Sequence, residues 1–328
     1  MISVYRHQNG ETERVEQVDP KWLDPSTSLG AGAPGITFWV DLVAPTADEQ
    51  RLLTDVFKFH PLSVEDALSA IHHPKIEPYT GYLYLILHGI DFHAGERGFA
   101  TRDVDFFLGP NYLVTVHDGH SRSIASWKEI CDRHEHALAE GPVGLPHRIV
   151  DTMVDNYRPE IDALEEKIDL LEEEAVLDTG ADMIRQILEL KRDLASLRRV
   201  VLPQRDAVGR LARREFTQIS DEMTYRFRDV HDQLIRLSEE AILFQDRISG
   251  ILEAHLSTIS NRLNVVMKVL TVMSTIFLPL TVLTGMWGMN VPLPQFPGGE
   301  DVQFWWVGGA MLAIAAVMLG LFRRNGWI

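Results

Sequence analysis

Two long apolar segments lie near the C-terminal end of the chain. Residues 269–287 read VLTVMSTIFLPLTVLTGMW and residues 304–322 read FWWVGGAMLAIAAVMLGLF, and neither segment contains Asp, Glu, Lys or Arg. A helix of this length rises about 28 Å, close to the bilayer's hydrocarbon thickness of about 30 Å. Pro279 is compatible with such a helix, because hydroxyl side chains and neighbouring helices can satisfy the backbone group that proline frees. The pattern predicts two membrane spans in a transmembrane domain of residues 269–328. A buried hairpin of a soluble core is the weaker alternative.

The polar part of the chain begins with short runs typical of strands. Four runs are rich in β-branched and aromatic residues, at positions 36–43, 82–92, 104–108 and 112–116. Helical patterns fill the intervals, at positions 47–59, 63–68 and 123–140. A Gly-Pro-Asn turn at 109–111 separates the last two runs. These patterns predict an α/β N-terminal domain over residues 1–141.

Helical periodicity with dense charge follows, from residue 142 to residue 268. Residues 150–176 and 183–201 have helical spacing, and the sequence offers breaks at Gly180 and near Pro203. We therefore expect a long helical stalk over residues 142–268.

The last helix of this stalk is expected to continue into the first span. From Asp221 to Met286 only Gly250 and Pro279 are weak points, so about 66 residues would extend on the order of 100 Å. Apolar or small side chains recur at steps of three and four, at Val230, Leu234, Leu237, Ala241, Phe244, Ile248, Ile251, His255, Ile259, Leu263 and Val266. Such a seam is typical of coiled coils, and we expect the helix to pack against copies of itself in a homo-oligomer.

Charge narrows the class of protein. The net charge is −16, nearly all of it before the spans, which argues against nucleic acid as a partner because phosphate binding needs a positive field. The single cysteine, Cys131, cannot form an intrachain disulfide and is compatible with a reducing compartment. The first ten residues lack the apolar core of a signal peptide.

The distribution of positive charge predicts the orientation of the spans. Basic residues flank the pair of spans on the sides away from their connecting loop, at Arg262, Lys268, Arg323 and Arg324. The loop, residues 288–303, contains no Lys or Arg and carries Glu300 and Asp301. The positive-inside rule then predicts a protein of the cell inner membrane with both termini on the cytoplasmic side and the loop on the outer side.

The end of the first span carries a candidate ion site. It reads Gly-Met-Trp-Gly-Met-Asn at residues 285–290, so Asn290 places an amide at a membrane exit. In a symmetric oligomer these amides would form a ring of neutral oxygen acceptors. Such a ring suits the water shell of a small dication, which dehydrates reluctantly. The alternative is a simple helix C-cap. The residues alone do not decide between the two.

The chain resembles the CorA family of magnesium and cobalt transporters. The resemblance rests on Gly288-Met289-Asn290 after a span, on a second span with a basic tail, and on the whole of residues 264–290. It extends to YRFRDV at 225–230, to SVED at 63–66 and to HPKIE at 73–77, and so covers essentially the whole chain. It implies a funnel-shaped homopentamer that conducts divalent cations through a central pore lined by the first span.

The resemblance also implies roles for individual residues. Gly288, Met289 and Asn290 correspond to a selectivity filter. Pore and gate positions correspond to Asn264, Met267, Leu270, Leu278 and Thr281. Separations of 3, 8 and 11 residues keep Met267, Leu270 and Leu278 on one helical face. The family often has methionine where this chain has Leu278.

A regulatory role is implied for a cytoplasmic metal site. Asp229 lies in the matching stalk segment, and its partner from a neighbouring copy would be Asp91 or His93. Independently of the resemblance, several copies at −16 each would repel one another. Bound dications would offset that repulsion, and their loss would let the stalk open. The alternative for Asp229 is an ordinary solvated carboxylate.

The outer loop departs from the magnesium-type pattern. Where that pattern continues Met-Pro-Glu, residues 291–301 read VPLPQFPGGED, which is more similar to the ZntB zinc-transporter branch, although that branch often has valine at the position of Met289. Glu300 and Asp301 still offer attraction for cations. Magnesium is therefore the favoured ion. The alternatives are zinc, with or without proton coupling, cobalt and nickel. Of the thirteen histidines, pairs such as His72-His73 and His134-x-His136 lack cysteine or carboxylate partners and suit a protein surface better than a zinc site.

Two other classes of protein explain the sequence less well. An enzyme is disfavoured because the chain has no phosphate-binding glycine loop, nucleophile elbow or zinc-hydrolase motif. A membrane-anchored scaffold would explain the spans and the stalk but would leave the polar and apolar rings of the first span without a role. We therefore expect a transporter without a bound cofactor.

Overall fold

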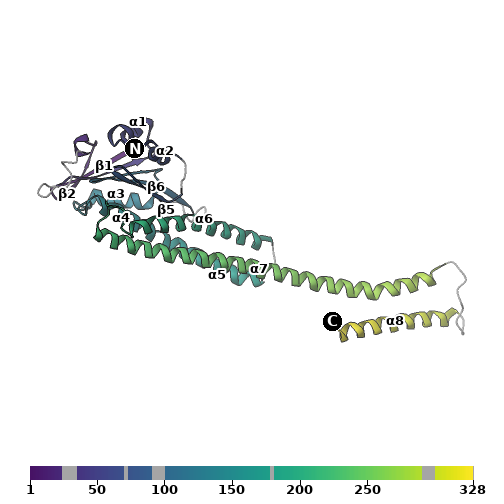
Figure 1. Cartoon of the computed structure of the whole chain (residues 1–328). Helices are drawn as coiled ribbons and strands as arrows, with labels where there is room; N and C mark the ends of the chain where they lie inside the picture. Colours follow the sequence, from purple (N-terminus) through teal and green to yellow (C-terminus); the bar gives the residue numbers. More distant parts are fainter. Residues whose placement is uncertain (24–34, 70–72, 91–99, 178–180, 290–299, 328) are drawn as a thin grey trace. The chain divides into compact units, whose positions relative to one another are not determined.

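The computed structural model describes residues 1–23, 35–69, 73–90, 100–177, 181–289 and 300–327 (Figure 1). The chain divides into two compact units. The first unit comprises residues 1–174 and 180–252, and the second comprises residues 175–179 and 253–328. The division into three domains expected from sequence composition stays a prediction.

A seven-stranded sheet organises the first unit. Its strand order is β2-β1-β3-β7-β6-β5-β4. Only β3 and β7 run parallel, and every other neighbouring pair is antiparallel. The strands are β1 Ile2–Gln8, β2 Glu11–Val15, β3 Thr37–Val43, β4 Lys75–Tyr79, β5 Tyr82–Ile90, β6 Thr101–Leu108 and β7 Tyr112–His117. The four central strands confirm the four predicted runs, and their ends differ from the predicted ones by at most three residues.

The three strands that the hydrophobic pattern did not reveal lie at or near the sheet edges. β1 and β2 are rich in polar residues, and the only local signal for them is Asn9-Gly10, where both residues have positive φ and close the hairpin. β4 contains Pro78, which removes a backbone donor and is tolerated because β4 is an edge strand.

One face of the sheet carries an apolar core covered by short helical segments. These are η1 Pro20–Leu23, α1 Ala47–Arg51, η3 Leu52–Val56 and α2 Pro61–Leu68. Phe38, Tyr84, Phe107 and Val114 of the sheet belong to one buried cluster with residues of these segments. The predicted helix over 47–59 is shorter than expected. It begins with a capping box between Thr46 and Glu49, and a π-helical turn ends it at Val56.

The other face is covered by α3 Arg122–Arg133, α4 Gly141–Asp155 and part of α6. The predicted helix over 123–140 is wrong in its second half, because α3 ends at Arg133 and turns lead to α4. Pro146 lies inside α4 and is buried. The sequence pattern predicted one continuous helix over 150–176, but a turn at Asn156 divides this segment into two helices.

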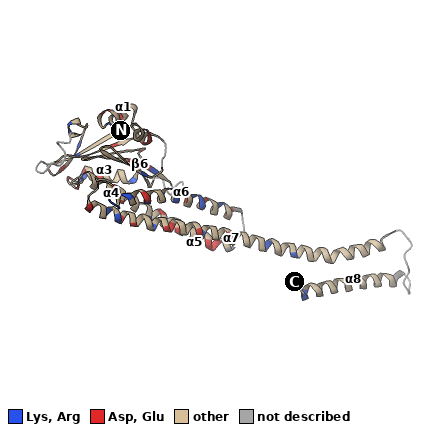
Figure 2. Cartoon of the chain, in the orientation of Figure 1, with Lys and Arg blue, Asp and Glu red and all other residues tan. Residues whose placement is uncertain are grey.

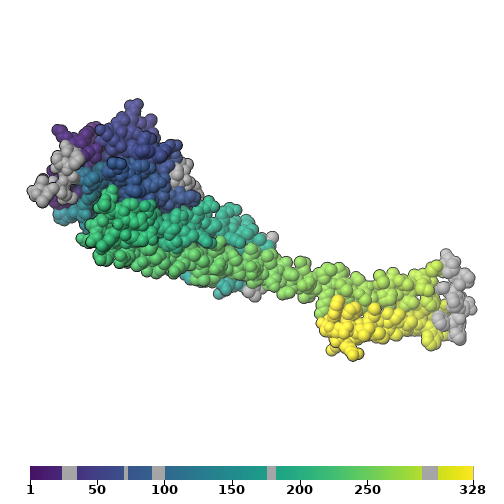
Figure 3. Space-filling model, viewed as in Figure 1, coloured from purple at the N-terminus to yellow at the C-terminus, as the bar shows by residue number. Residues whose placement is uncertain are grey.

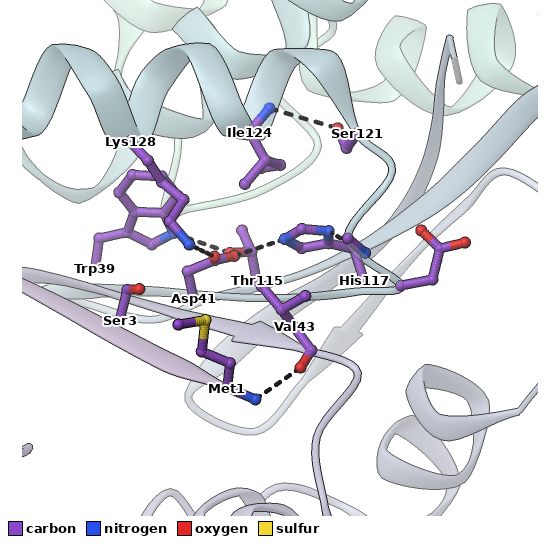
Figure 4. A network of polar contacts seen from close by, with 12 residues as sticks. Met1, Ser3, Trp39, Asp41, Val43, Thr115, His117, Ser121, Ile124 and Lys128 are labelled. Carbon is purple, nitrogen blue, oxygen red and sulfur yellow. Dashed lines mark hydrogen bonds and ion pairs between the residues drawn. The ribbon is translucent and has the colours of Figure 1, made fainter. Parts of the chain in front are cut away.

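A buried ionic network ties α3 to the parallel pair β3–β7 (Figure 4). The fully buried carboxylate of Asp41 accepts hydrogen bonds from Thr115 Oγ1 (2.7 Å), His117 Nε2 (3.0 Å) and Lys128 Nζ (2.8 Å). Gly119 N–H donates to His117 Nδ1, which leaves Nε2 as the donor toward Asp41. Burial alone would raise the pKa of Asp41, but His117 and Lys128 outweigh it and lower that pKa.

Three long helices follow: α5 Tyr157–Leu177, α6 Ala181–Leu211 and α7 Asp221–Trp287. The break predicted near Pro203 is wrong. Buried apolar side chains on both sides of the proline, such as Val201 and Val208, keep α6 packed to its end.

The first part of the α7 seam is covered by the chain itself. Its side chains from Val230 to Ile251 are at most 6% exposed. Hydrogen bonds link this part of α7 to α5 and α6, among them Arg158–Glu240 and Arg198–Gln245. In the space-filling view this part of α7 packs against the preceding helices (Figure 3). The expectation that these residues pack against other copies is therefore wrong, because α5 and α6 of the same chain occupy that face. Farther along, the seam residues Leu263 and Val266 are about three-fifths exposed.

The second unit contains the two apolar helical segments. The end of α7 and α8, Glu300–Arg324, are long and apolar enough to cross a membrane, each with a window of mean hydropathy 2.0. Lys268 Nζ donates to the carbonyl of Gly326 just beyond α8 (2.9 Å), so α8 runs beside the end of α7 (Figure 1). Both predicted spans are thus helices of the expected position.

Candidate functional site

One face of the apolar part of α7 carries the predicted pore positions and is open. The side chains of Met267, Leu270 and Leu278 are 60%, 59% and 69% exposed, and Asn264 and Thr281 are also exposed. Their spacing places all five within about one third of the helix circumference. The structure thus brings these residues to one face, as the sequence predicted.

The opposite face of α7 is partly covered. Val272 is 8% exposed, and the other half-buried positions lie within one broad sector around it: Lys268, Thr275, Ile276, Pro279, Leu280, Leu283 and Trp287. Lys268 on this face bonds the end of α8. The α8 side and the predicted pore side of α7 are therefore roughly opposite each other.

Two further small or hydroxylated residues on the open face, Ser274 and Gly285, were not singled out by the sequence. Helical spacing puts Ser274 and Gly285 on it, 10 and 21 residues after Asn264. Thr281 Oγ1 donates to the carbonyl of Phe277 (2.8 Å), which leaves its oxygen lone pairs available as acceptors. The open face therefore carries both large apolar side chains and small or hydroxylated residues.

The predicted filter lies where α7 ends. The N–H of Gly288 still bonds the Thr284 carbonyl (2.9 Å), and Met289 is 55% exposed. Asn290 and the loop to residue 299 lie outside the described residues, and so do the side chains of Glu300 and Asp301. Their assignment stays a prediction.

The predicted regulatory residue Asp229 lies near two carboxylates of α4. Burial, followed by the negative charges of Asp151 and Asp229, raises the pKa of Asp155. Asp151 and Asp155 were not predicted from the sequence, where their only local signal is a spacing of four residues on one helix face. The cluster of Asp151, Asp155 and Asp229 is referred to below as the α4–α7 acidic cluster.

A second set of contacts fixes α7 against α4 beside this cluster. Glu140, at the start of α4, accepts hydrogen bonds from Arg148 Nε (3.0 Å) and from Arg226 Nη1 of α7 (2.8 Å). These bonds, first of all the one from Arg148, lower the pKa of Glu140 to about 2. His147 packs edge-on against Phe227, with ring centroids 5.1 Å apart. The contacts of Arg226 and Phe227 therefore hold α7 against α4 within one turn of Asp229.

One chain does not provide a complete direct metal site among its described residues. No three of their His, Cys, Asp and Glu side chains are placed to hold an ion. The proposed partner residues Asp91 and His93 lie outside the described residues, as does His72. The acidic cluster is thus a set of acceptors that needs further ligands to bind an ion directly.

Comparisons with known proteins agree along the whole chain. The model of the CorA-like Mg2+ transporter protein family matches residues 35–324. YfjQ of Bacillus subtilis is 32% identical, over 96% of this chain and 92% of its own length. The cobalt/magnesium transport protein CorA of Thermotoga maritima is 28% identical, over 99% of this chain and 90% of its own length.

The fold agrees with solved structures as well. The complete structure of the CorA magnesium transporter from Methanocaldococcus jannaschii superposes with a TM-score of 0.81 at 18% identity, covering all of this chain and 99% of that one. The ZntB cytoplasmic domain from Vibrio parahaemolyticus gives a TM-score of 0.62 at 15% identity, covering 79% of this chain and 97% of that domain. The mixed α/β domain, the long helix and two apolar C-terminal helices are thus a known combination. The chain belongs to the family of CorA-like Mg2+ transporter proteins, which transport divalent metal ions and are not enzymes.

Proposed function

We propose that the protein is a homopentameric magnesium channel of the cell inner membrane, with both termini in the cytoplasm. The observation that carries the proposal is the open face of α7. Its apolar side chains are not covered within the chain, and the opposite face already has α8 beside it. Five copies that turn this face inward would enclose a pore with Asn264, Met267, Leu270, Leu278 and Thr281 along its wall.

This lining favours an ion that keeps its water. The open face offers amide and hydroxyl oxygens but no carboxylate, imidazole or thiolate from Asn264 to Met289. Magnesium dehydrates reluctantly, so neutral acceptors that bond its water shell suit it. Rings formed by Met267, Leu270 and Leu278 would close the pore when they are narrow, because water leaves a narrow apolar constriction. Asn290, with Gly288 and Met289, would select at the outer end, and Glu300 and Asp301 would attract cations to it.

Cytoplasmic metal would regulate the channel at the α4–α7 acidic cluster. Burial and two like charges already disfavour the ionised form of Asp155, so a bound dication would relieve repulsion there. Ligands from a neighbouring copy, Asp91 among them, would complete the site. Metal would thereby hold neighbouring copies together in the closed state, and its loss would favour opening.

Zinc, with or without proton coupling, is the second candidate ion. The specific observation in its favour is the outer-loop sequence, VPLPQFPGGED, which lacks the acidic start of the magnesium-type loop. Likeness to the ZntB cytoplasmic domain concerns the fold alone and does not separate the two ions.

Metal uptake into proteoliposomes tests the proposal. Magnesium uptake that follows the magnesium gradient and membrane potential, and is indifferent to pH, is the expected result. Asn290→Ala should abolish it in protein that still purifies as the wild-type oligomer. Zinc uptake that rises with an inward proton gradient, without magnesium uptake, would instead establish the second candidate.

Protease resistance of α7 tests the regulatory site. Magnesium should protect the wild-type chain, and Asp229→Ala should lose that protection. Asp246→Ala removes an exposed carboxylate elsewhere on α7 and should keep it. Equal cleavage of the wild type with and without metal would refute the regulatory role.

A further inference from the structure

The outward face of α5 is acidic around one exposed leucine. Asp162, Glu166, Leu170 and Glu173 follow at helical spacing, opposite the buried Ile161, Leu164 and Ile168. All four are exposed, and Leu170 is 55% exposed. These four residues are called the α5 acidic stripe.

The outward face of α6 has the opposite charge around another exposed leucine. Arg185, Leu188, Arg192 and Arg199 lie opposite a buried row that includes Ile187, Leu190 and Leu194, and Leu188 is 50% exposed. These four residues are called the α6 basic stripe. Helix α5 contains eight acidic and two basic residues, whereas α6 contains seven basic and four acidic ones (Figure 2).

The stripes are not neutralised within the chain. Glu166, Glu173, Arg192 and Arg199 have no ion-pair partner among the described residues, and Asp162 and Arg185 pair only locally, with Arg158 and Asp182. The α5 carboxylates nearer α7 behave differently, because Asp169 and Glu172 both bond Arg247 (2.7 and 2.6 Å). The outward charges are therefore available to another molecule.

We propose that the α5 acidic stripe of one copy docks on the α6 basic stripe of the next copy. The inference rests on the homopentamer of the proposed function and names a contact within it. Two different, complementary patches on one chain make a heterologous contact, which is the kind of contact that builds a ring when the rotation between copies closes. A leucine within a charged border also matches the apolar centre and polar rim of protein interfaces. Contacts between identical stripes are disfavoured by like charge.

Mixed crosslinking of single-cysteine copies tests the contact. In a Cys131→Ser background, one tagged chain carries Leu170→Cys and a differently tagged chain carries Leu188→Cys. A bis-maleimide should link the two tags in co-expressed full-length protein. Because each chain has one cysteine, no intrachain link can form. Leu243→Cys, exposed on α7 outside both stripes, paired with Leu188→Cys is the control and should not crosslink.

Charge reversal provides the second measurement. Glu166→Arg with Glu173→Arg in the Leu170→Cys chain should lower the yield of crosslink roughly tenfold, because like charges would then face each other. Arg192→Glu with Arg199→Glu in the Leu188→Cys chain should do the same. Combining the two reversed chains should restore the yield, which a merely unfolded variant would not do.

The outcomes separate this contact from the proposed function. A pentameric mass in detergent together with no link between Leu170→Cys and Leu188→Cys overturns the contact and leaves the channel proposal standing. Crosslinks that are indifferent to charge reversal overturn the stripes as its cause. A monomeric wild-type protein in both detergent and lipid overturns the ring itself, and with it both proposals.

Discussion

The two compact units of the chain differ in how far they bury their own apolar side chains. In the first unit, β5 and β7 bury every residue, against helices of the same chain. In the second unit, 6% of the most apolar window of α7 is buried and none of that of α8. Burial of apolar surface contributes about 25 cal/mol per Å2. The first unit is therefore stabilised from within, and the second depends on what surrounds it.

Helix α7 contains both situations. Ile248 is fully buried by its own chain, whereas Leu263 and Leu278 are 60% and 69% exposed. The apolar spacing is similar in both parts. The spacing therefore shows that a face will be covered but does not say whether its own chain, another copy or lipid covers it.

Of the changes considered, replacing Lys128 with methionine should have the largest effect on the stability of the first unit. It would leave the buried Asp41 carboxylate without its cation, at a cost of about 3–5 kcal/mol. Pulse proteolysis in urea measures the free energy of unfolding. Lys167→Met, at an exposed position of α5, is the control and should be nearly neutral. Asp41→Asn added to Lys128→Met should recover part of the loss, and no recovery would argue against the ionic network.

A pair of leucine substitutions contrasts the two units. Leu83→Ala, at a fully buried site of β5, should lower the free energy of unfolding by about 2–5 kcal/mol. Leu278→Ala should leave unfolding of the first unit unchanged and raise ion leak in proteoliposomes, because it widens a proposed apolar ring. Leu280→Ala, on the α8 side of the same helix, should raise leak less. Equal leak from both variants would contradict the pore face.

Sequence patterns predicted the central strands and both spans because those features depend on local periodicity. The pore positions of α7 came instead from the resemblance to the CorA family, and periodicity added only that they share one helical face. The patterns missed β4 because Pro78 argues against a strand except at a sheet edge, and the sequence does not show which strands are edges. They predicted a break at Pro203 because the sequence does not show that α6 is buried on both sides of that proline. The α4–α7 acidic cluster was missed for a related reason. Asp155 and Asp229 are far apart in the sequence, and only the packing of α4 on α7 brings their charges together.

Acid should weaken the contact that positions this cluster. The folded-state pKa of Glu140, about 2, lies below its ordinary value of 4.5, so its ionised form stabilises the fold. That stability is present above about pH 4.5 and is lost as pH falls toward 2. Glu140→Gln should flatten the pH dependence of unfolding in this window. Glu16→Gln, at an exposed position just after β2, should not, and identical pH profiles for both variants would contradict the role of Glu140.

The smallest expected effect concerns the second unit and the hydrogen bond from Lys268 Nζ to the carbonyl of Gly326. A cation near a helix C-terminus contributes about 0.3–1 kcal/mol, because it complements the partial negative charge of the last carbonyls. Lys268→Met should therefore lower the thermal midpoint of the purified oligomer slightly, while Lys268→Arg keeps the charge and should preserve it. If the second unit is stabilised mainly by lipid and by other copies, the decrease in the thermal midpoint caused by Lys268→Met will be smaller in a bilayer than in detergent. A large loss in the bilayer would instead show that this unit, like the first, depends on polar contacts within its own chain.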